Sequence, residues 1–256
     1  MQRKLRIFLN VLFFSRSKEQ VYLMYFSLRG SKMKQIKEGK TKDVYQLEDG
    51  NILLQFKDTA TVDESGKIDT GGNKVGATIE GVGLASLRTT TYYFKKMIDA
   101  GIPTHFISSN LKEGTMIVKP ASFFGNGLEH ICRLKATGSF MRRYGEYATE
   151  GQDLDYLVEV SIKNDEAGDP MITEDALAEL GILTHEQYDE LKTMTKKITK
   201  IVKEDLEEKG LTLYDMKVEY GLVDGKPTLI DEISPGCMRV YKGDEHLDSL
   251  ELGKYF

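Results

Sequence analysis

The chain has 256 residues, 40 % of them hydrophobic and only 5 of them proline, a composition that suits a globular core and excludes collagen-like and low-complexity chains. Its net charge of −5 is uneven, because residues 1–32 hold seven Lys or Arg against one acid and the remainder holds 28 against 39, a net charge of −11. An acidic body repels nucleic acid, so we expect no nucleic-acid partner and small anionic ligands held by local clusters of Lys and Arg.

The first 32 residues combine basic side chains with an apolar run over residues 7–14. This pattern matches a signal peptide poorly, because Asn10 interrupts the run and no small-x-small cleavage site follows it. The run is also far shorter than the roughly 20 residues that span a bilayer, so we expect no membrane partner. We interpret residues 1–32 as an extension translated upstream of Met33 that is not part of the fold. An amphipathic helix on a membrane surface is the alternative.

Residues 33–120 are predicted to form an N-terminal lobe built mainly from short strands. One helix is predicted within it over residues 83–100, because Gly101 and Pro103 follow as a helix stop. The strands are predicted at residues 44–47, 51–57 and 115–119, with a hairpin turn at residues 48–51.

Residues 121–256 are predicted to form a larger C-terminal lobe that mixes strands and helices. Its clearest helix begins at Thr184, whose spacing to Gln187 resembles a capping box, and ends at Gly210. Shorter elements are predicted as strands at residues 129–135 and 155–162 and as a helix at residues 139–144.

The two cysteines, Cys132 and Cys237, lie far apart and form no CxxC pair. This usage argues against a disulfide framework and a zinc site, and it is typical of a reducing compartment. We therefore predict a cytoplasmic protein with two ordinary buried thiols.

Strict alternation over residues 213–220 predicts a strand with one charged face, formed by Asp215, Lys217 and Glu219. The opposite face is predicted to carry Tyr214, Met216, Val218 and Tyr220. A turn at Asp224-Gly225 leads into residues 227–233, so the two segments should form a hairpin. A loop with an odd number of residues would place Asp231 beside Glu219, whereas an even number would place Glu232 there. We predict the odd number, or a bulge.

Two basic segments are candidates for phosphate binding. In the first, Gly39 allows backbone N–H groups to approach an anion, and Lys40 and Lys42 supply charge; a solvated lysine turn is the alternative. In the second, Arg133 precedes Ser139 at the start of a helix, with Arg142 and Arg143 beyond; the alternative is a helix cap with surface arginines.

Two acidic segments are candidates for binding magnesium or a substrate amine. Residues 163–170 form a polar turn after a strand, and a purely structural turn is the alternative. The charged row of Asp215, Lys217 and Glu219 is followed by Asp231 and Glu232, and two acids near a phosphate-binding lysine suit magnesium. A solvent-facing strand is the alternative here.

These four segments, in this order, resemble the signature blocks of the SAICAR synthetase family over about residues 36–241. The strongest matches are residues 215–221 and residues 231–239. The resemblance implies a two-lobed, ATP-grasp-like or kinase-like α+β fold, with an antiparallel N-terminal sheet lobe and a larger α+β C-terminal lobe. It implies an ATP-dependent ligase that joins carboxyaminoimidazole ribotide to L-aspartate, with ATP and Mg²⁺ as cofactors, and we expect a homo-oligomer.

The resemblance also implies a role for each matching residue. Catalysis is assigned to Lys217, Asp215 and Glu219, and ATP binding to Gly39, Lys40, Thr41, Lys42, Val44 and Lys163. Substrate binding is assigned to Arg133, Ser139, Asp215, Lys217, Ser234 and Arg239, and Mg²⁺ binding to Glu219, Asp231 and Asp169.

Two features depart from the family pattern. Gly236 stands where the family has an acid, and the sequence stops soon after Leu250, where the family continues. They leave two alternatives open: a divergent paralogue that uses another carboxylate, and a nucleotide-binding protein that has lost catalysis. A phosphotransferase is the third alternative, because inositol-phosphate kinases share a related lobe arrangement and a similar Asp-x-Lys strand.

Overall fold

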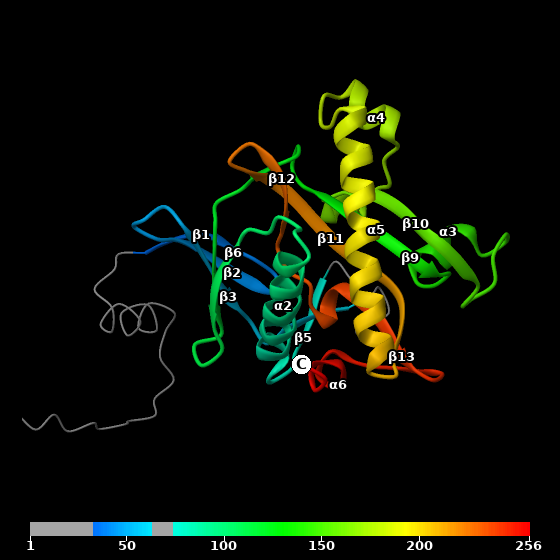
Figure 1. Cartoon of the computed structure of the whole chain (residues 1–256), viewed down its shortest axis with the longest axis horizontal. Coiled ribbons are helices and arrows are strands. Elements are labelled where there is room, and N and C mark those ends of the chain that lie inside the picture. Colours follow the sequence, from blue (N-terminus) through cyan, green and yellow to red (C-terminus); the bar gives the residue numbers. More distant parts are fainter. Residues whose placement is uncertain (1–32, 63–73) are drawn as a thin grey trace, which may run out of the picture.

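The computed structural model describes residues 33–62 and 74–256, so the predicted extension over residues 1–32 lies outside the described residues. Two antiparallel sheets, each accompanied by one long helix, make up most of the described chain (Figure 1). Such a mixed arrangement of antiparallel sheets and helices confirms the α+β fold predicted from the sequence.

The first sheet has five strands in the order β1-β2-β3-β7-β6. The predicted turn between β2 and β3 forms because Asp49 accepts a hydrogen bond from the Asn51 backbone N–H at 2.9 Å and Gly50 adopts a φ of 85°. A separate two-stranded hairpin, β4-β5, flanks the gap in the described residues. The bounds are β1 (Lys34–Glu38), β2 (Lys42–Gln46), β3 (Ile52–Phe56), β4 (Thr59–Val62), β5 (Lys74–Thr78), β6 (Phe106–Asn110) and β7 (Thr115–Val118).

Helix α2 (Val82–Asp99) follows β5 in the chain and contacts β3 and β6 of the five-stranded sheet. It buries Leu87, Phe94 and Met97, and Gly101 follows its end with a φ of 73°. The helix predicted over residues 83–100 is therefore confirmed.

The second sheet is larger and is built around β11, which pairs with β9, β12, β13 and β8. The full path runs β10-β9-β11-β13-β14. The bounds are β8 (Ser122–Phe123), β9 (Leu128–Lys135), β10 (Asp153–Ile162), β11 (Thr212–Val223), β12 (Lys226–Ile230), β13 (Met238–Lys242) and β14 (Glu245–His246).

Helix α5 (His185–Glu208) covers one face of this sheet, as Figure 1 shows where it crosses β9, β10 and β11. The predicted capping box of Thr184 and Gln187 is present, and it satisfies backbone N–H groups at the helix start. The helix buries an apolar stripe against the core face of β11, so the opposite face of β11 is free for charged side chains. The remaining short helices are α3 (Ser139–Tyr144), η1 (Asp165–Ala167), α4 (Glu174–Glu179), η2 (Pro235–Cys237) and α6 (Ser249–Gly253).

The hairpin between β11 and β12 corrects the predicted register. Its loop has two residues, Asp224 and Gly225, with φ values of 52° and 75°, as the tight Asp-Gly turn of a hairpin requires. Glu219 consequently pairs with Ile230, and the predicted odd loop is wrong. The irregularity comes instead at Asp231, which follows the strand with a φ of 62°.

At the start of β11 a second expectation is wrong: Tyr214 was predicted on the core face with Met216 and Val218, but it does not lie there. The pairing of β11 with β13 shifts between Leu213 and Asp215, so Leu213 enters the core instead. Tyr214 stacks on Tyr241, with ring centroids 3.8 Å apart.

The two sheets meet along one short parallel contact between Thr104, which precedes β6, and Leu229 of β12. The backbone N–H of His105 donates to the Leu229 carbonyl at 3.0 Å, and the Leu229 N–H donates to the Pro103 carbonyl at 2.9 Å. One buried apolar cluster includes residues of both sheets. The division at about residue 120 into two lobes remains a prediction. Among the described residues, every helix is too short or too polar to span a bilayer.

Candidate active site

The charged face of β11 carries Asp215, Lys217 and Glu219, as the alternation predicts, while Met216 and Val218 enter the core. The neighbouring strand β9 brings its own charged residues to this row, because Arg133 pairs with Asp215 and Glu129 pairs with Glu219. Side chains directly opposite each other on one face of a sheet lie within contact distance. Two groups of charged side chains form in this way, one at each end of the row.

The first group, here called the arginine cluster, consists of Arg133, Ser139, Glu159, Asp215 and Arg239. The Arg133 side chain is only 2 % exposed, and its Nη1 donates to Asp215 Oδ2 at 2.7 Å. Its Nε donates to Glu159 Oε2 at 2.5 Å, and its Nη2 donates to Ser139 Oγ at 2.9 Å. Arg239 Nη1 also donates to Asp215 Oδ2, at 2.8 Å, so one carboxylate holds two guanidinium groups.

Two backbone features place the arginine cluster. Gly138 has a φ of 55°, and a Cβ there would lie 2.7 Å from Cζ of Arg239, so glycine lets the loop approach this guanidinium group. Gly138 is also the N-cap of α3 and makes no side-chain cap bond. Ser139 accepts from Arg133 instead of capping the helix, which argues against the alternative of a plain helix cap. Arg143 Nη2 donates to Glu159 Oε1 at 2.6 Å.

The second group, here called the lysine cluster, consists of Lys42, Lys163, Lys217, Glu219 and Asp231. Lys217 Nζ donates to Glu219 Oε1 at 2.7 Å, and Lys163 Nζ donates to both oxygens of the same carboxylate at 2.9 Å. Burial lowers the pKa of Lys217, but the charges of Glu219 and Glu129 outweigh this effect and raise it well above its ordinary value. Lys217 therefore remains a cation at neutral pH.

Lys42 joins the first sheet to the lysine cluster. Its side chain is 9 % exposed, and Nζ lies 3.0 Å from Asp231 Oδ1 and contacts Glu232 Oε1 even more closely. Burial lowers the pKa of Lys42, but Asp231 and Glu232 outweigh it, so the pKa is raised. Burial raises the pKa of Asp231, yet the charges of Lys42, Lys217 and Lys163 reverse this effect, so the pKa is lowered. The hairpin's acids and the turn that begins at Gly39 thus share one charged site.

The turn before β2 is held by several contacts of its own. The Gly39 N–H donates to the Lys42 carbonyl at 2.9 Å, and a Cβ at Gly39 would lie 2.3 Å from that oxygen. Lys57 Nζ donates to the Gly39 carbonyl at 2.9 Å. Lys40 Nζ is 2.6 Å from exposed Asp165, so the alternative of a solvated lysine turn fits Lys40 but does not describe the buried Lys42. Thr41 contributes its carbonyl, which accepts from the Lys57 N–H at 2.9 Å.

Some predicted site residues do not reach these clusters directly. Asp169 accepts a hydrogen bond from the Asn164 N–H at 2.8 Å and so closes its own turn. Within residues 33–62 and 74–256, no hydrogen bond or ion pair joins it to Glu219 or Asp231. Val44 packs against the core, and buried Ser234 donates to Cys237 Sγ at 3.6 Å. Ser234 therefore supports the loop after β12.

The predictions missed Glu129 and Glu159, and they named Asp165 and Glu232 within candidate segments without giving either a role. Glu159 holds Arg133, Glu129 is 3.2 Å from Lys217 Nζ, Asp165 pairs with Lys40, and Glu232 pairs with Lys42. Glu129 and Glu159 lie in strands that were predicted, but the pairing of those strands with β11 has no local signal. Asp165 lies in the predicted polar turn, where composition does not tell one acid from another.

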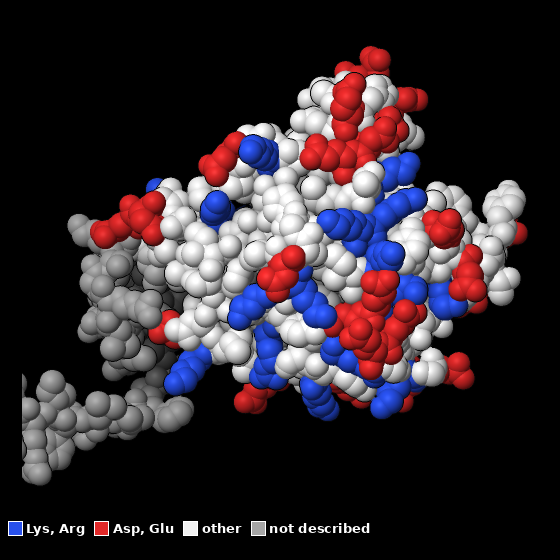
Figure 2. All heavy atoms as spheres, in the orientation of Figure 1, with Lys and Arg blue, Asp and Glu red and all other residues white. Residues whose placement is uncertain are grey.

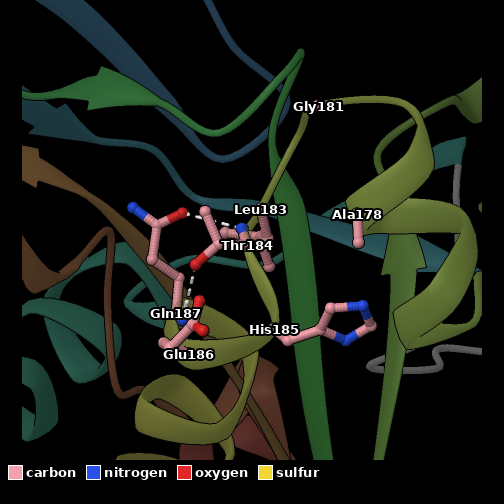
Figure 3. Close-up of a pocket in the computed structure, with 7 residues that line it drawn as sticks. All are labelled: Ala178, Gly181, Leu183, Thr184, His185, Glu186 and Gln187. Carbon is pink, nitrogen blue, oxygen red and sulfur yellow. Dashed lines mark hydrogen bonds between the residues drawn. The ribbon is translucent and has the colours of Figure 1, made fainter.

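A recess elsewhere on the surface is not a second site of this kind. Figure 3 shows it beside the start of α5, where Thr184 and Gln187 exchange the capping bonds. His185 points away from that pair, and its Nδ1 lies 2.6 Å from Glu174 Oε1. The recess is thus bordered by a helix cap, whereas the charged row of β11 brings cations and carboxylates together. On the face drawn in Figure 2, basic and acidic side chains are interspersed.

Comparison with known proteins agrees with this geometry. The sequence profile of the SAICAR synthetase family matches residues 35–253. The chain is 57 % identical over 224 residues to the phosphoribosylaminoimidazole-succinocarboxamide synthase of Clostridium tetani, covering 87 % of this chain and 98 % of that protein. It is 40 % identical over 213 residues to the synthase of Thermotoga petrophila, covering 82 % of this chain and 86 % of that one.

Solved structures give the same result. A SAICAR synthetase in complex with ADP superposes with a TM-score of 0.74 at 30 % identity, covering 85 % of this chain and 88 % of that one. The synthase of Ehrlichia chaffeensis gives a TM-score of 0.75 at 29 % identity, covering 87 % and 90 %. The chain therefore belongs to the SAICAR synthetase family.

Proposed function

We propose that this ligase joins carboxyaminoimidazole ribotide to L-aspartate at the charged face of β11, with cleavage of ATP to ADP and phosphate. The observation that carries the proposal is the contact of Lys42 with Asp231 and Glu232, which brings the turn at Gly39 to the hairpin. Family membership and the charge pattern both support this activity.

In the proposed reaction, an oxygen of the imidazole carboxylate attacks the γ-phosphorus of ATP, and ADP leaves as the bond to its oxygen breaks. The amine of L-aspartate then attacks the carbonyl carbon of the acyl phosphate and loses a proton to solvent. The bond to phosphate breaks, and inorganic phosphate leaves with its electron pair. Each step gathers negative charge on oxygen, which positioned cations stabilise.

The lysine cluster is suited to this electrostatic work and not to proton transfer. Lys42 and Lys217 have raised pKa values, so both stay charged in every step at neutral pH. Burial raises the pKa of Cys237 to about 12, which keeps the neighbouring thiol protonated and unreactive. The residues around β11 therefore align substrates and neutralise phosphate oxygens without a covalent intermediate on the protein.

Magnesium fits this site only if the nucleotide shares it. Within the described part of the chain, no three His, Cys, Asp or Glu side chains are grouped closely enough to hold a metal alone. Mg²⁺ is usually held by one or two carboxylates together with substrate phosphates and water. We propose Glu219 and Asp231 as the two carboxylates, because both face Lys163 and Lys217. The ion would neutralise phosphate charge there.

The arginine cluster is proposed to bind the ribotide. Arg133 and Ser139 bring several hydrogen-bond donors together beside the start of α3. Arg239 binds the same Asp215 carboxylate as Arg133 and is more exposed than Arg133. Guanidinium groups bind phosphate through paired hydrogen bonds, so we assign the ribotide phosphate to this end of β11. The imidazole carboxylate would then extend along the strand toward Lys217.

The direct test supplies the purified chain with ATP, Mg²⁺, carboxyaminoimidazole ribotide and a panel of amino acids and follows ADP. We expect ADP only when ribotide and L-aspartate are both present. ADP that forms without any amino acid would favour a phosphotransferase. ADP that forms with another carboxylate substrate would favour a divergent paralogue, an alternative suggested by Gly236, which stands where the family has an acid. ATP binding without turnover would indicate a protein that has lost catalysis.

We also propose a cytoplasmic homo-oligomer. The cytoplasmic location is supported by two free, buried cysteines, Cys132 and Cys237. The oligomer is supported by the family resemblance alone and is tested by light scattering after size-exclusion chromatography.

A further inference from the structure

Arg133 is the most buried charged side chain of the arginine cluster, and the protein itself uses most of its donors. Its side chain is 2 % exposed. Nε donates to Glu159 and Nη2 to Ser139, while Nη1 donates to Asp215 and, at 3.5 Å, to the Thr137 carbonyl. Four of its five N–H groups therefore have partners within the chain. Arg133 is suited to hold the cluster together and has little left for a ligand.

Glu159 joins two arginines at the edge of the charged face, where β10 pairs with β9. It opposes Ile131 and is therefore the diagonal neighbour of Arg133 on the same face. Its side chain is 9 % exposed, and each oxygen accepts from a different arginine. Oε2 accepts from Arg133 Nε at 2.5 Å, and Oε1 accepts from Arg143 Nη2 at 2.6 Å. Such charge-assisted bonds fix both guanidinium groups relative to each other.

Arg143 is the more accessible of these two arginines. It belongs to α3, which lies beside β9 and β10 in Figure 1, and it follows Ser139 by four residues, so both share one face of the helix. Its side chain is 28 % exposed, and its Cζ lies 5.2 Å from the centre of the Tyr144 ring, which supports the guanidinium group. Among the described residues its one side-chain hydrogen bond is to Glu159, so most of its N–H groups are left for a ligand.

Arg239 approaches Ser139 from the opposite side of the same loop. A Cβ on Gly138 would lie 2.7 Å from Cζ of Arg239, whereas Arg143 reaches Ser139 along α3. Ser139 Oγ accepts from Arg133, so its own O–H can donate to a ligand. The three guanidinium groups of this region exceed the two carboxylates by one positive charge. An anion with several acceptor oxygens, such as a phosphate group, matches this arrangement of donors.

We propose that Arg143 is a further ribotide-binding residue, which contacts the phosphate together with Arg239 and the Ser139 hydroxyl. Glu159 is the positioning residue that holds Arg143 in place. Buried Arg133 supports both without contacting the phosphate. This inference rests on the proposed function, because it names the side chains that bind the ribotide phosphate.

The decisive comparison is between Arg143→Met and Arg142→Met, which remove the same charge from neighbouring positions of α3. Arg142 is exposed, and within the described residues no hydrogen bond or ion pair engages it. We expect Arg143→Met to raise the KM for the ribotide about 10- to 100-fold, as the loss of a hydrogen bond between charged groups does, with kcat within about threefold. Arg142→Met should raise that KM by about twofold or less. Equal KM values in the two variants would overturn the proposal.

Glu159→Gln tests the positioning role, because glutamine keeps the shape of the side chain and removes the charge that holds Arg143. We expect it to raise the KM for the ribotide about tenfold and to leave the KM for ATP unchanged. In an Arg143→Met background it should add less than about threefold, because its effect passes through Arg143. Losses that multiply fully, or a lower melting temperature with a wild-type KM, would overturn the positioning role.

Glu159→Asp replaces Glu159→Gln if the latter is unfolded in a thermal melt. It keeps the charge but withdraws the carboxylate by one methylene from Arg143. A raised KM for the ribotide in this variant supports the positioning role, and a wild-type KM overturns it.

Binding of ribose 5-phosphate separates this inference from the proposed function, because it needs neither ATP nor turnover. In calorimetric titrations of the full chain, Kd should rise about tenfold or more in Arg143→Met and stay within about twofold of wild type in Arg142→Met. This ranking without ADP formation from the ribotide would overturn the ligase reaction and leave the phosphate contact supported. Equal affinities in the two variants, with ADP formed at a wild-type KM for the ribotide, would overturn the inference and leave the ligase reaction supported.

Discussion

The arginine cluster and the lysine cluster share one face of β11 but are assembled in different ways. The arginine cluster draws its members from one sheet and the loop beside it, where strand pairing sets Arg133 and Arg239 on either side of Asp215. The lysine cluster needs Lys42 from the other sheet and the left-handed turn at Asp231. Sheet register alone therefore builds the cluster proposed to bind the ribotide, whereas the cluster proposed to bind the nucleotide depends on how the two sheets meet.

The largest effect is expected at the contact between the sheets. Lys42→Met removes the cation that faces Asp231 and Glu232 and leaves the buried Glu232 carboxylate and the partly buried Asp231 carboxylate without it. Breaking a buried ion pair by removal of one partner costs about 3 to 5 kcal/mol, so the free energy of unfolding in urea should fall by that order. Lys40→Met is the control, because Lys40 is 35 % exposed and pairs with exposed Asp165. Equal losses in the two variants would contradict the distinction between them.

Acid should weaken the fold through its two buried histidines, His105 and His130. Burial lowers the pKa of His105 to about 4 and that of His130 to about 3, whereas both rings bind protons below about pH 6.5 once unfolded. The unfolded chain then binds more protons, so the free energy of unfolding falls as the pH drops from 6.5 toward 4, by at most about 1.4 kcal/mol per pH unit for each histidine.

Substitution of His130 separates its contribution to the loss of stability in acid from that of His105. His130→Leu should make the loss between pH 6.5 and pH 4 shallower, and urea unfolding at several pH values measures it. A slope that is identical in wild type and His130→Leu would show that His130 is already protonated or not buried in the folded protein.

A smaller effect is expected at the arginine cluster. Asp215→Asn keeps an acceptor oxygen but removes the charge shared by Arg133 and Arg239, at a cost of about 1 to 3 kcal/mol in the free energy of unfolding. The KM for the ribotide should rise, while the KM for ATP stays within about twofold because the nucleotide end is untouched. Steady-state kinetics with each substrate varied in turn checks this split, and a larger change in the KM for ATP would contradict it.

The smallest effect is expected at Gly138. Gly138→Ala adds a Cβ 2.7 Å from the Arg239 guanidinium group and strains a φ of 55°. Gly151→Ala is the matched control, because Gly151 has a φ of 78° but nothing lies within 4 Å of its added Cβ. Both variants should lose about 1 kcal/mol of stability to backbone strain, and only Gly138→Ala should raise the KM for the ribotide. The same KM in both would show that contact with Arg239 does not matter for binding.

What the sequence predicts well is local. The β2–β3 turn, helix α2, the capping box of α5 and the charged face of β11 all follow from spacing or turn chemistry within a few residues. The predicted hairpin register was wrong because the alternation of residues in the sequence does not fix the number of loop residues. Asp224 and Gly225 form a two-residue turn, which is shorter than the predicted odd-numbered loop.

The missed features are long-range. Glu159 holds Arg133 from a strand 26 residues away, and Lys42 meets Glu232 across 190 residues of chain. Neither contact leaves a periodic signal, since pairing between distant strands depends on the whole packed core. The bulge that turns Tyr214 out of the core is another such feature, because the pairing with β13 creates it.

The most direct test of the charged face of β11 as the ligase site is the rate of ADP release by Lys217→Met at saturating ATP, ribotide and L-aspartate. Lys163 still pairs with Glu219 in this variant, so the protein should fold with a melting temperature close to that of wild type. We expect ADP release to fall by about 100-fold or more, because a cation beside the reacting phosphate is lost. A folded variant that releases ADP at the wild-type rate would contradict the assignment of the reaction to this strand.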